Sequence, residues 1–361
     1  MILCTKGTFP LVLHLNLHSQ TNEQGVDMLS KRENFLETIH GGNPDRFVNG
    51  YEYLDLVLGD PVNFYVRGKH FPGMEPSFDA WGVRTIWPEG EPGALPDPKL
   101  KALEDIEEWK DVIKVPDLIA HCSAEDLWTP FLEKVAKVDR TDKMLGLFAP
   151  TGIFERMHNL MGFEDTFCNM MEEPELMTEL SWAIADYRMD GFKLMVENVH
   201  PDVILSHDDW GSKTSLFFPP QLWRDIFKPQ YERIYGYLHD QGVIVIHHSD
   251  SFNEPIIQDM IDCHIDVWQG ALATNDIVKL QEQTQGKIAF QGGIETNEVD
   301  KLTCTEEQVR AEVRRACSTY GPRGYYIPSL TYGDPFGTLV KKESNAWIAD
   351  EIDKMSEEMF A

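Results

Sequence analysis

Residues 243–250, with the sequence VIVIHHSD, join a continuous apolar run to a cluster of titratable side chains. A continuous run of this kind is typical of a parallel strand that is buried on both faces. Similar short runs recur at residues 144–149, 202–206, 265–269, 288–291 and 325–328. Longer stretches with helical periodicity separate them, at residues 163–199, 220–241, 252–262, 274–285 and 305–320. This alternation predicts an α/β fold built on a parallel sheet.

The length of the chain fits a single (β/α)₈ TIM barrel with long N-terminal loops. Such barrels typically need about 250 residues, and more where the loops are long. The chain has 361 residues, so one barrel accounts for it. Two further strands have to come from the N-terminal third, where residues 48–58 and 79–87 are the candidates. Ser30 can cap a helix over residues 30–41, and the Gly- and Pro-rich residues 71–98 predict a long loop that covers the site.

The first residues of the chain stand apart from this pattern. Residues 1–27 contain no small-residue cleavage site, and their apolar run is too short and too polar to span a bilayer. We therefore interpret residues 1–27 as an N-terminal extension that the fold can dispense with, and residues 28–361 as the barrel domain.

Charge and cysteine content exclude several classes of partner. With 60 acidic against 32 basic side chains, the chain carries a formal charge of −28. Such a surface repels the phosphates of nucleic acids and anionic membranes, so we expect neither as a partner. The six cysteines include no C-x-x-C pair, which argues against a disulfide framework and a structural zinc knuckle. We expect a cytoplasmic protein.

Candidate site residues follow the predicted strands, because functional side chains of a barrel come from the C-terminal ends of its strands. His248 and Asp250 lie two positions apart in an extended segment, so they project together and can supply two ligands to one divalent ion. The alternative is that one histidine packs under the mouth and Asp250 caps the next helix.

Other strand ends add further candidates. One of Asp208 and Asp209 should face the cavity as a general base, a substrate acceptor or a metal ligand; the alternative is a helix cap or a solvated loop. Glu295 follows a glycine pair that suits either close approach to a ligand or a tight turn. Arg156 and His158 can face the mouth or lie on a helix surface.

The order and spacing of several short segments resemble the uroporphyrinogen decarboxylase superfamily from about Ser30 to the end of the chain. The segments are residues 152–156 (GIFER), 208–211 (DDWG), 219–224 (PPQLWR) with 228–229 (KP), 248–250 (HSD), 275–276 (ND) and 292–295 (GGIE). The resemblance implies a (β/α)₈ barrel. It also implies one of two chemistries: cofactor-free porphyrinogen decarboxylation, or zinc-dependent methyl transfer involving corrinoid proteins.

The sequence departs from the patterns of both branches of the family, and these departures bear on the choice between decarboxylation and methyl transfer. The Arg-Gln-Ala-Gly-Arg stretch of the decarboxylases has no counterpart near residues 45–50, which read DRFVNG. The thiol-methylating branch has a His-x-Cys pair where this chain has His248-x-Asp250, and a later cysteine that would fall near Tyr332. The resemblance thus implies an oxygen-rich zinc site made by His248, Asp250 and Glu295 or an aspartate at 208–209. A harder Lewis acid of this kind suits an ether or alcohol oxygen better than a thiol.

The leading hypothesis is a methyltransferase that demethylates a small methylated substrate, such as an aryl methyl ether, and passes the methyl group to a corrinoid carried by a separate corrinoid-binding protein. Asp208, Asp209, Glu295 and Arg156 are its candidate catalytic residues. A planar substrate would suit the aromatic residues expected at the mouth, which are Trp81, Phe154, Trp210, Phe217 and Trp268, although packing alone also explains them. The alternatives are a metal-free decarboxylase of the uroporphyrinogen type and a binding protein that has lost catalysis. A homodimer stays open.

Overall fold

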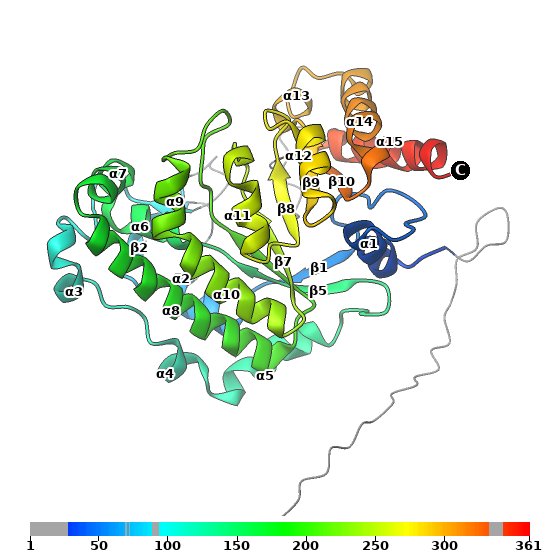
Figure 1. Cartoon of the computed structure of the whole chain (residues 1–361). Helices are drawn as coiled ribbons and strands as arrows, with labels where there is room; N and C mark the ends of the chain where they lie inside the picture. Colours follow the sequence, from blue (N-terminus) through cyan, green and yellow to red (C-terminus); the bar gives the residue numbers. More distant parts are fainter. Residues whose placement is uncertain (1–27, 69–70, 72, 89–93, 332–341) are drawn as a thin grey trace, which may run out of the picture.

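Seven parallel strands form a curled sheet in the computed structural model, with helices packed around its outside (Figure 1). The structure describes residues 28–68, 71, 73–88, 94–331 and 342–361, so the predicted extension 1–27 lies outside the described residues. Within these ranges the strand order is β1-β5-β6-β7-β8-β9-β10. The strands are β1 (Leu54–Val57), β5 (Met144–Ala149), β6 (Val203–His207), β7 (Ile244–His248), β8 (Val267–Ala271), β9 (Ala289–Ile294) and β10 (Tyr326–Leu330). The predicted TIM-barrel type of α/β fold is confirmed.

Helices connect successive strands, and α8 and α10 run side by side outside the sheet (Figure 1). The α-helices are α1 (Lys31–His40), α2 (Pro61–Arg67), α3 (Trp109–Val112), α4 (Leu118–Cys122), α5 (Glu125–Val135), α6 (Ile153–Met161), α7 (Phe163–Glu172), α8 (Pro174–Val199), α9 (Pro220–Ile226), α10 (Lys228–Asp240), α11 (Ile257–Asp262), α12 (Ile277–Thr284), α13 (Thr296–Val299), α14 (Glu306–Tyr320) and α15 (Glu343–Met359). Short 3₁₀ helices occupy Ile106–Glu108, Glu254–Ile256 and Gly321–Arg323. The helix predicted over residues 163–199 is divided at Pro174, because proline lacks the N–H that a continuous helix needs and starts a new helix instead.

One of the two N-terminal strand predictions is confirmed and the other is wrong. Residues 48–58 contain β1, which pairs in parallel with β5. Residues 79–87 contribute only β3 (Arg84–Ile86) to a separate antiparallel sheet with β2 (Ser77–Phe78) and β4 (Leu95–Pro96). The reason is a tight turn: Asp79 accepts hydrogen bonds from the backbone N–H groups of Trp81 and Val83, which reverses the chain before a long strand can form.

Side chains on the barrel strands alternate between two separate hydrophobic cores. Val203, Leu205 and Ile246 belong to the inner core of the barrel, whereas Ile204 and Val245 belong to the outer core between sheet and helices. Because the alternation has a period of two, the last residues of β6 and β7 continue it. The inner face therefore ends in histidines at 207 and 248, and the outer face ends in residues 206 and 247.

Helix α1 closes the N-terminal end of the barrel. A capping box of Ser30 and Glu33 starts the helix, as the sequence predicts, and Gly41 ends it in the left-handed conformation with φ 69°. Phe35 is fully buried in the inner core, and its ring stacks on Tyr53 with 3.9 Å between centroids. With this end filled, the C-terminal ends of the strands are the accessible end of the barrel.

In the part of the chain that the structure covers, none of the helices is apolar enough over sufficient length to cross a membrane. Five cysteines lie in the same ranges, and all five are free thiols: Cys122, Cys168, Cys263, Cys304 and Cys317.

Replacing Phe35 with alanine should destabilise the protein by about 3–5 kcal/mol, because it removes a fully buried ring and leaves a cavity at the base of the barrel. The measurement is the midpoint of urea denaturation followed by circular dichroism. Leu302→Ala is the control, since Leu302 is 75% exposed and its truncation should leave the midpoint unchanged. Equal midpoints for wild type and Phe35→Ala would contradict the role given to α1.

Candidate metal centre

Two histidines from neighbouring strands meet inside the accessible end of the barrel. The register of β6 and β7 pairs His207 directly with His248, and their rings stack with 4.5 Å between centroids at an angle of 10°. Asp209 follows His207 by two residues. One ligand atom from each of His207, Asp209 and His248 can be chosen so that all three lie within 4.8 Å of one another. This is the spacing of a group that can share one metal ion.

Each of these histidines has a hydrogen-bond partner for its Nδ1 atom. Nδ1 of His207 lies 2.8 Å from a carboxylate oxygen of Glu155, and Nδ1 of His248 contacts the side-chain oxygen of Gln269. Both partners are acceptors, so each Nδ1 carries a proton that faces its partner. Nε2 is the ring atom left for a metal ion, which in His207 would have to replace the second proton of the imidazolium. Metal-binding histidines in proteins are oriented by carboxylate or carbonyl oxygens in this way.

Carboxylates surround His207 and control its charge. Burial disfavours the imidazolium, but the charges of Glu155 and Asp209 outweigh that effect and raise the pKa of His207 to about 10. Burial would likewise raise the pKa of Glu155, yet the His207 cation brings it down to about 2. Burial and the neighbouring His207 cation lower the pKa of His248. The site therefore favours a positive charge between its carboxylates.

The donor set fits a divalent ion. Two imidazoles and one carboxylate are the protein ligands of one class of catalytic zinc sites, which keep a further position open for a substrate or water. His207, His248 and Asp209 supply this set, while Glu155 and Gln269 hold the two rings. The set lacks a thiolate, as the resemblance implies, but with two imidazoles and one carboxylate it contains more nitrogen than the oxygen-rich set that was expected.

Asp208 and Asp209 point to opposite sides of the strand end. The fully buried Asp208 accepts hydrogen bonds from the backbone N–H groups of Phe154 and Glu155, at 3.0 and 2.8 Å. Trp210 and Tyr231 donate to the same carboxylate. Burial and the charge of Glu155 raise the pKa of Asp208 to about 7. Asp208 thus anchors the start of α6, the helix that carries Glu155.

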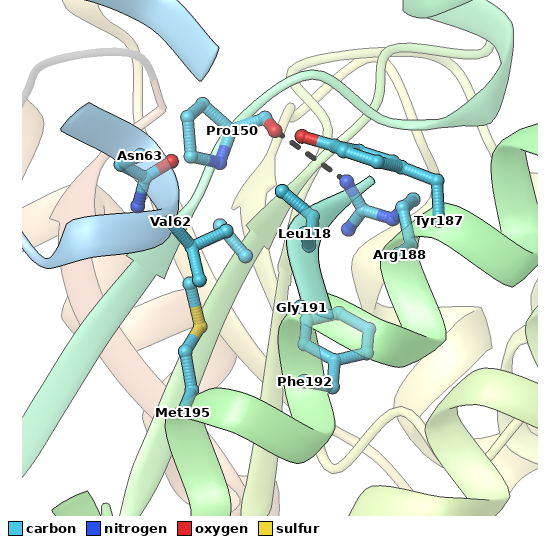
Figure 2. A pocket seen from close by; sticks show the side chains of 10 residues that line it. Val62, Asn63, Leu118, Pro150, Tyr187, Arg188, Gly191, Phe192 and Met195 are labelled. Atoms are coloured by element: carbon cyan, nitrogen blue, oxygen red, sulfur yellow. Dashed lines mark hydrogen bonds between the residues drawn. The ribbon is translucent and has the colours of Figure 1, made fainter. Parts of the chain in front are cut away.

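Gly152 makes this anchoring possible, because a Cβ atom at that position would lie 2.1 Å from the side chain of Asp208. Arg188 fixes the preceding loop from the other side. Its guanidinium donates to the carbonyl oxygens of Thr151 at 2.6 Å and Pro150 at 3.4 Å, and to the hydroxyl of Ser206 at 2.8 Å. Figure 2 shows Arg188 at the edge of a small cavity of about 30 Å³ between α2 and α8. The loop between β5 and α6 is therefore tied to β6.

His247, which precedes His248, is a packing residue. It is fully buried, stacks on Trp210 with 4.2 Å between ring centroids, and its Nδ1 lies 2.9 Å from the hydroxyl of Tyr235. Burial holds the pKa of His247 well below its usual range, so the ring is neutral. Of the adjacent histidines, only His248 faces the barrel interior.

The remaining predicted residues lie at different distances from this cluster. Asp250 is next to it: its backbone N–H donates to Asp209 at 3.0 Å, and burial together with the charge of Asp209 raises the pKa of Asp250 to about 7. Glu295 accepts a hydrogen bond from the backbone of Ala273 at 2.7 Å, at the end of β9. Neither carboxylate belongs to the group of three ligand atoms, so their role as ligands stays a prediction. Tyr332 lies outside the described residues.

Arg156 makes an ion pair with Asp79 at 2.6 Å and does not belong to the group of three ligand residues. Burial lowers the pKa of His158, and the charges of Glu155 and Asp209 act in the opposite direction. The glycine pair before Glu295 serves packing: a Cβ on Gly292 would lie 2.6 Å from the carbonyl oxygen of Ala271.

Most of the aromatic residues predicted at the mouth are core residues. At most 2% of the surface is exposed for Trp81, Phe154, Trp210 and Trp268. Phe217 is partly buried, and its ring lies 5.0 Å from that of Phe163, which is 45% exposed. Phe163 also contacts His158, with 5.4 Å between ring centroids. Phe163 therefore offers exposed aromatic surface next to His158.

His207 is the site residue that sequence reasoning missed, although a signal was present. The spacing His207-x-Asp209 is the same as His248-x-Asp250, and both pairs follow an apolar run. The missing information was the register, which places the two histidines opposite each other on neighbouring strands.

The family model of uroporphyrinogen decarboxylase (URO-D) matches residues 75–344 of the chain. The chain belongs to the URO-D family. A comparison of this chain with curated proteins found no significant match.

Among solved structures, a methyltransferase from Methanosarcina mazei is similar with a TM-score of 0.65 and 13% identity, over 90% of this chain and 99% of that one. A mannanase from Bacillus subtilis has a TM-score of 0.36 and 15% identity, over 70% of this chain and 73% of that one. A xylanase from Gloeophyllum trabeum also has a TM-score of 0.36, with 11% identity over 62% of this chain and 80% of that one. The first similarity shows that the fold is shared over most of this chain.

Replacing Asp208 and Asp209 one at a time with asparagine should distinguish the structural role of Asp208 from the candidate ligand role of Asp209. In Asp208→Asn the new amide group has to face at least one of the donors that now bind the carboxylate, so we expect a loss of about 2 kcal/mol of stability. Asp209→Asn keeps an acceptor for the N–H of Asp250, and the metal-free protein should stay within about 1 kcal/mol of wild type. Urea denaturation of both metal-free variants measures this, and the reverse order of stabilities would contradict the assignment.

Proposed function

We propose that this URO-D family member is a methyltransferase that takes the methyl group of a small aryl methyl ether and passes it to a corrinoid. The corrinoid would be a co-substrate carried by a separate corrinoid-binding protein, and the protein would work in the cytoplasm. The observation that carries the proposal is the cluster of His207, Asp209 and His248, in which both imidazoles are already held through Nδ1. The description of the similar Methanosarcina mazei protein as a methyltransferase agrees with it.

His207, Asp209 and His248 would hold a zinc ion, with Asp250 and Glu295 as further candidate ligands. The ion supplies Lewis-acid chemistry that stabilises negative charge on an oxygen. During transfer the O–CH₃ bond breaks, both of its electrons stay on the oxygen, and the methyl group bonds to the corrinoid nucleophile. The transfer therefore needs stabilisation of a leaving phenolate and no net redox change.

The chain's own residues would prepare this step by positioning. Glu155 keeps the proton of His207 on Nδ1, and Gln269 does the same for His248, so the ligand faces of both rings stay fixed. Asp208 holds the start of α6 and thereby Glu155. The exposed ring of Phe163, which packs on His158, offers an aromatic substrate a surface beside the cluster.

The alternative of a metal-free decarboxylase receives less support. The region that corresponds to the arginine-rich stretch of the decarboxylases contains Arg46, whose guanidinium pairs with Asp45 and donates to the carbonyl oxygen of Leu29. An arginine engaged in this way is not available to grip substrate carboxylates there. A reaction without a metal would also give no role to the cluster of His207, Asp209 and His248.

Metal content tests the proposed centre directly. Wild-type protein loaded with zinc and desalted should retain about one zinc per chain, and His207→Ala, His248→Ala and Asp209→Ala should each lose most of it, because a three-ligand site tolerates no missing donor. Glu295→Gln and Asp250→Asn test the remaining candidate ligands, and His239→Ala, on the exterior helix α10, is the control. The measurement is metal analysis by mass spectrometry. Full retention of zinc by His207→Ala would move the centre elsewhere.

Activity is tested with free cob(I)alamin and a panel of methoxybenzenes. Zinc-loaded wild type should consume cob(I)alamin, followed by its absorbance, and release one phenol for each methyl group transferred. Asp209→Asn should lower the rate by about tenfold or more, since it removes a charged ligand. Carbon dioxide release from a carboxylated substrate by metal-free protein, without demethylation, would support the decarboxylase instead.

A further inference from the structure

A second cavity lies beside the start of α6 and contains two arginines. Its volume is about 60 Å³, and Arg67, Asp79, Thr151, Arg156 and Asn159 are among the residues that line it. By the same measure one water molecule needs roughly 10–15 Å³, so the space accommodates a group of a few atoms.

Ion pairs are unevenly distributed among the described charged residues of this cavity. Arg156 pairs with Asp79, and both side chains are at least nine-tenths buried. Asp79 also accepts the backbone N–H groups of Trp81 and Val83, so its carboxylate is fully engaged. The structure gives Arg67 no carboxylate partner among the described residues. Of the two guanidinium groups, only that of Arg156 therefore has an ion pair with a described carboxylate, while the charges of Asp79 and Glu155 act on Arg67 from beyond ion-pair distance.

The surroundings of Arg67 make this imbalance costly. Arg67 is half-buried at the C-terminal end of α2. Burial and the charge of Arg156 lower the pKa of Arg67, so its guanidinium is a poorly solvated cation next to a like charge. A bound anion would relieve both effects, because a guanidinium binds a carboxylate through two parallel hydrogen bonds.

We propose that Arg67 and Arg156 bind the carboxylate group of the substrate in this cavity. The guanidinium of Arg67, which has no ion pair among the described residues, and the small volume both suit a carboxylate. Asn159 and Thr151 line the same space and can hydrogen-bond to it. This inference rests on the proposed function for its substrate, which becomes an aryl methyl ether that also carries a carboxylate.

The position of the cavity connects it to the metal centre. Arg156 directly follows Glu155, the residue that orients His207, and the charge of Glu155 also acts on Arg67. One turn of α6 thus carries a residue of each site. A substrate with its carboxylate between the arginines would have its other end directed by a fixed helix rather than by a loop.

The test is a binding measurement by calorimetry on zinc-loaded full-length protein without corrinoid, using 4-methoxybenzoate and its neutral analogue 4-methoxybenzamide. Wild type should bind the acid about tenfold or more tightly than the amide. Arg67→Gln should remove most of that preference while leaving the affinity for the amide unchanged. Arg323→Gln is the matched control, because Arg323 lies on the surface and pairs with Glu282.

A second variant changes the charge in the opposite direction. Asp79→Asn keeps an oxygen for the N–H groups of Trp81 and Val83 but frees Arg156, so it should bind the acid several-fold more tightly than wild type. Equal affinities of wild type for acid and amide, or weaker binding of the acid by a folded Asp79→Asn variant, would overturn the inference. Stronger competition by inorganic phosphate than by acetate would overturn the assignment to a carboxylate.

These outcomes are separate from those of the proposed function. A protein that prefers the acid through Arg67 but holds no zinc and transfers no methyl group would retain the carboxylate site and lose the methyltransferase. A protein that transfers methyl groups with equal affinity for acid and amide would retain the methyltransferase and lose the carboxylate site.

Discussion

The two-residue alternation of side chains along parallel strands is the constraint on which the rest of this structure depends. Val203 and Leu205 pack inside the barrel, so His207 has to point inside as well; Ile246 imposes the same direction on His248. The register of β6 and β7 then places the two imidazoles face to face. A slip by one residue would turn both rings toward the helices and bring Ser206 and His247 into the barrel instead.

The opposite face of the same strand ends supports the site. Asp208 binds the first N–H groups of α6, His247 packs against Trp210, and Ser206 accepts a hydrogen bond from Arg188. Each of these polar groups is buried and partnered, which a protein interior requires. Alternate residues at these strand ends therefore have different roles. One set, His207, Asp209 and His248, forms the cluster. The other set, Ser206, Asp208 and His247, holds the strand ends and α6 in position.

The two sides of the start of α6 differ in charge: acidic groups gather on one side and basic groups on the other. Carboxylates dominate around His207 and favour a cation, whereas guanidinium groups dominate in the cavity of Arg67 and favour an anion. Glu155 and Arg156, which are adjacent in the sequence, belong to the two different environments. Asp208 holds the start of α6 on the side of the histidines, and Asp79 holds Arg156 on the side of the cavity, so each of the two proposed sites has its own fixed partner.

The sequence by itself determined the α/β class, because apolar runs that alternate with helical periodicity indicate a parallel sheet covered by helices, and the chain length and the family resemblance pointed to a barrel. It also determined that titratable residues such as His248 and Asp209 lie at strand ends. Which of them meet was decided only by tertiary structure: His207 joins His248 through the strand register, and Asp208 turns away to cap α6. Residues 79–87 begin with a turn because Asp79 accepts backbone hydrogen bonds. The periodicity of the sequence does not predict these bonds. Periodicity fixes the face on which a side chain lies, whereas the partner across a strand depends on contacts between residues distant in the chain.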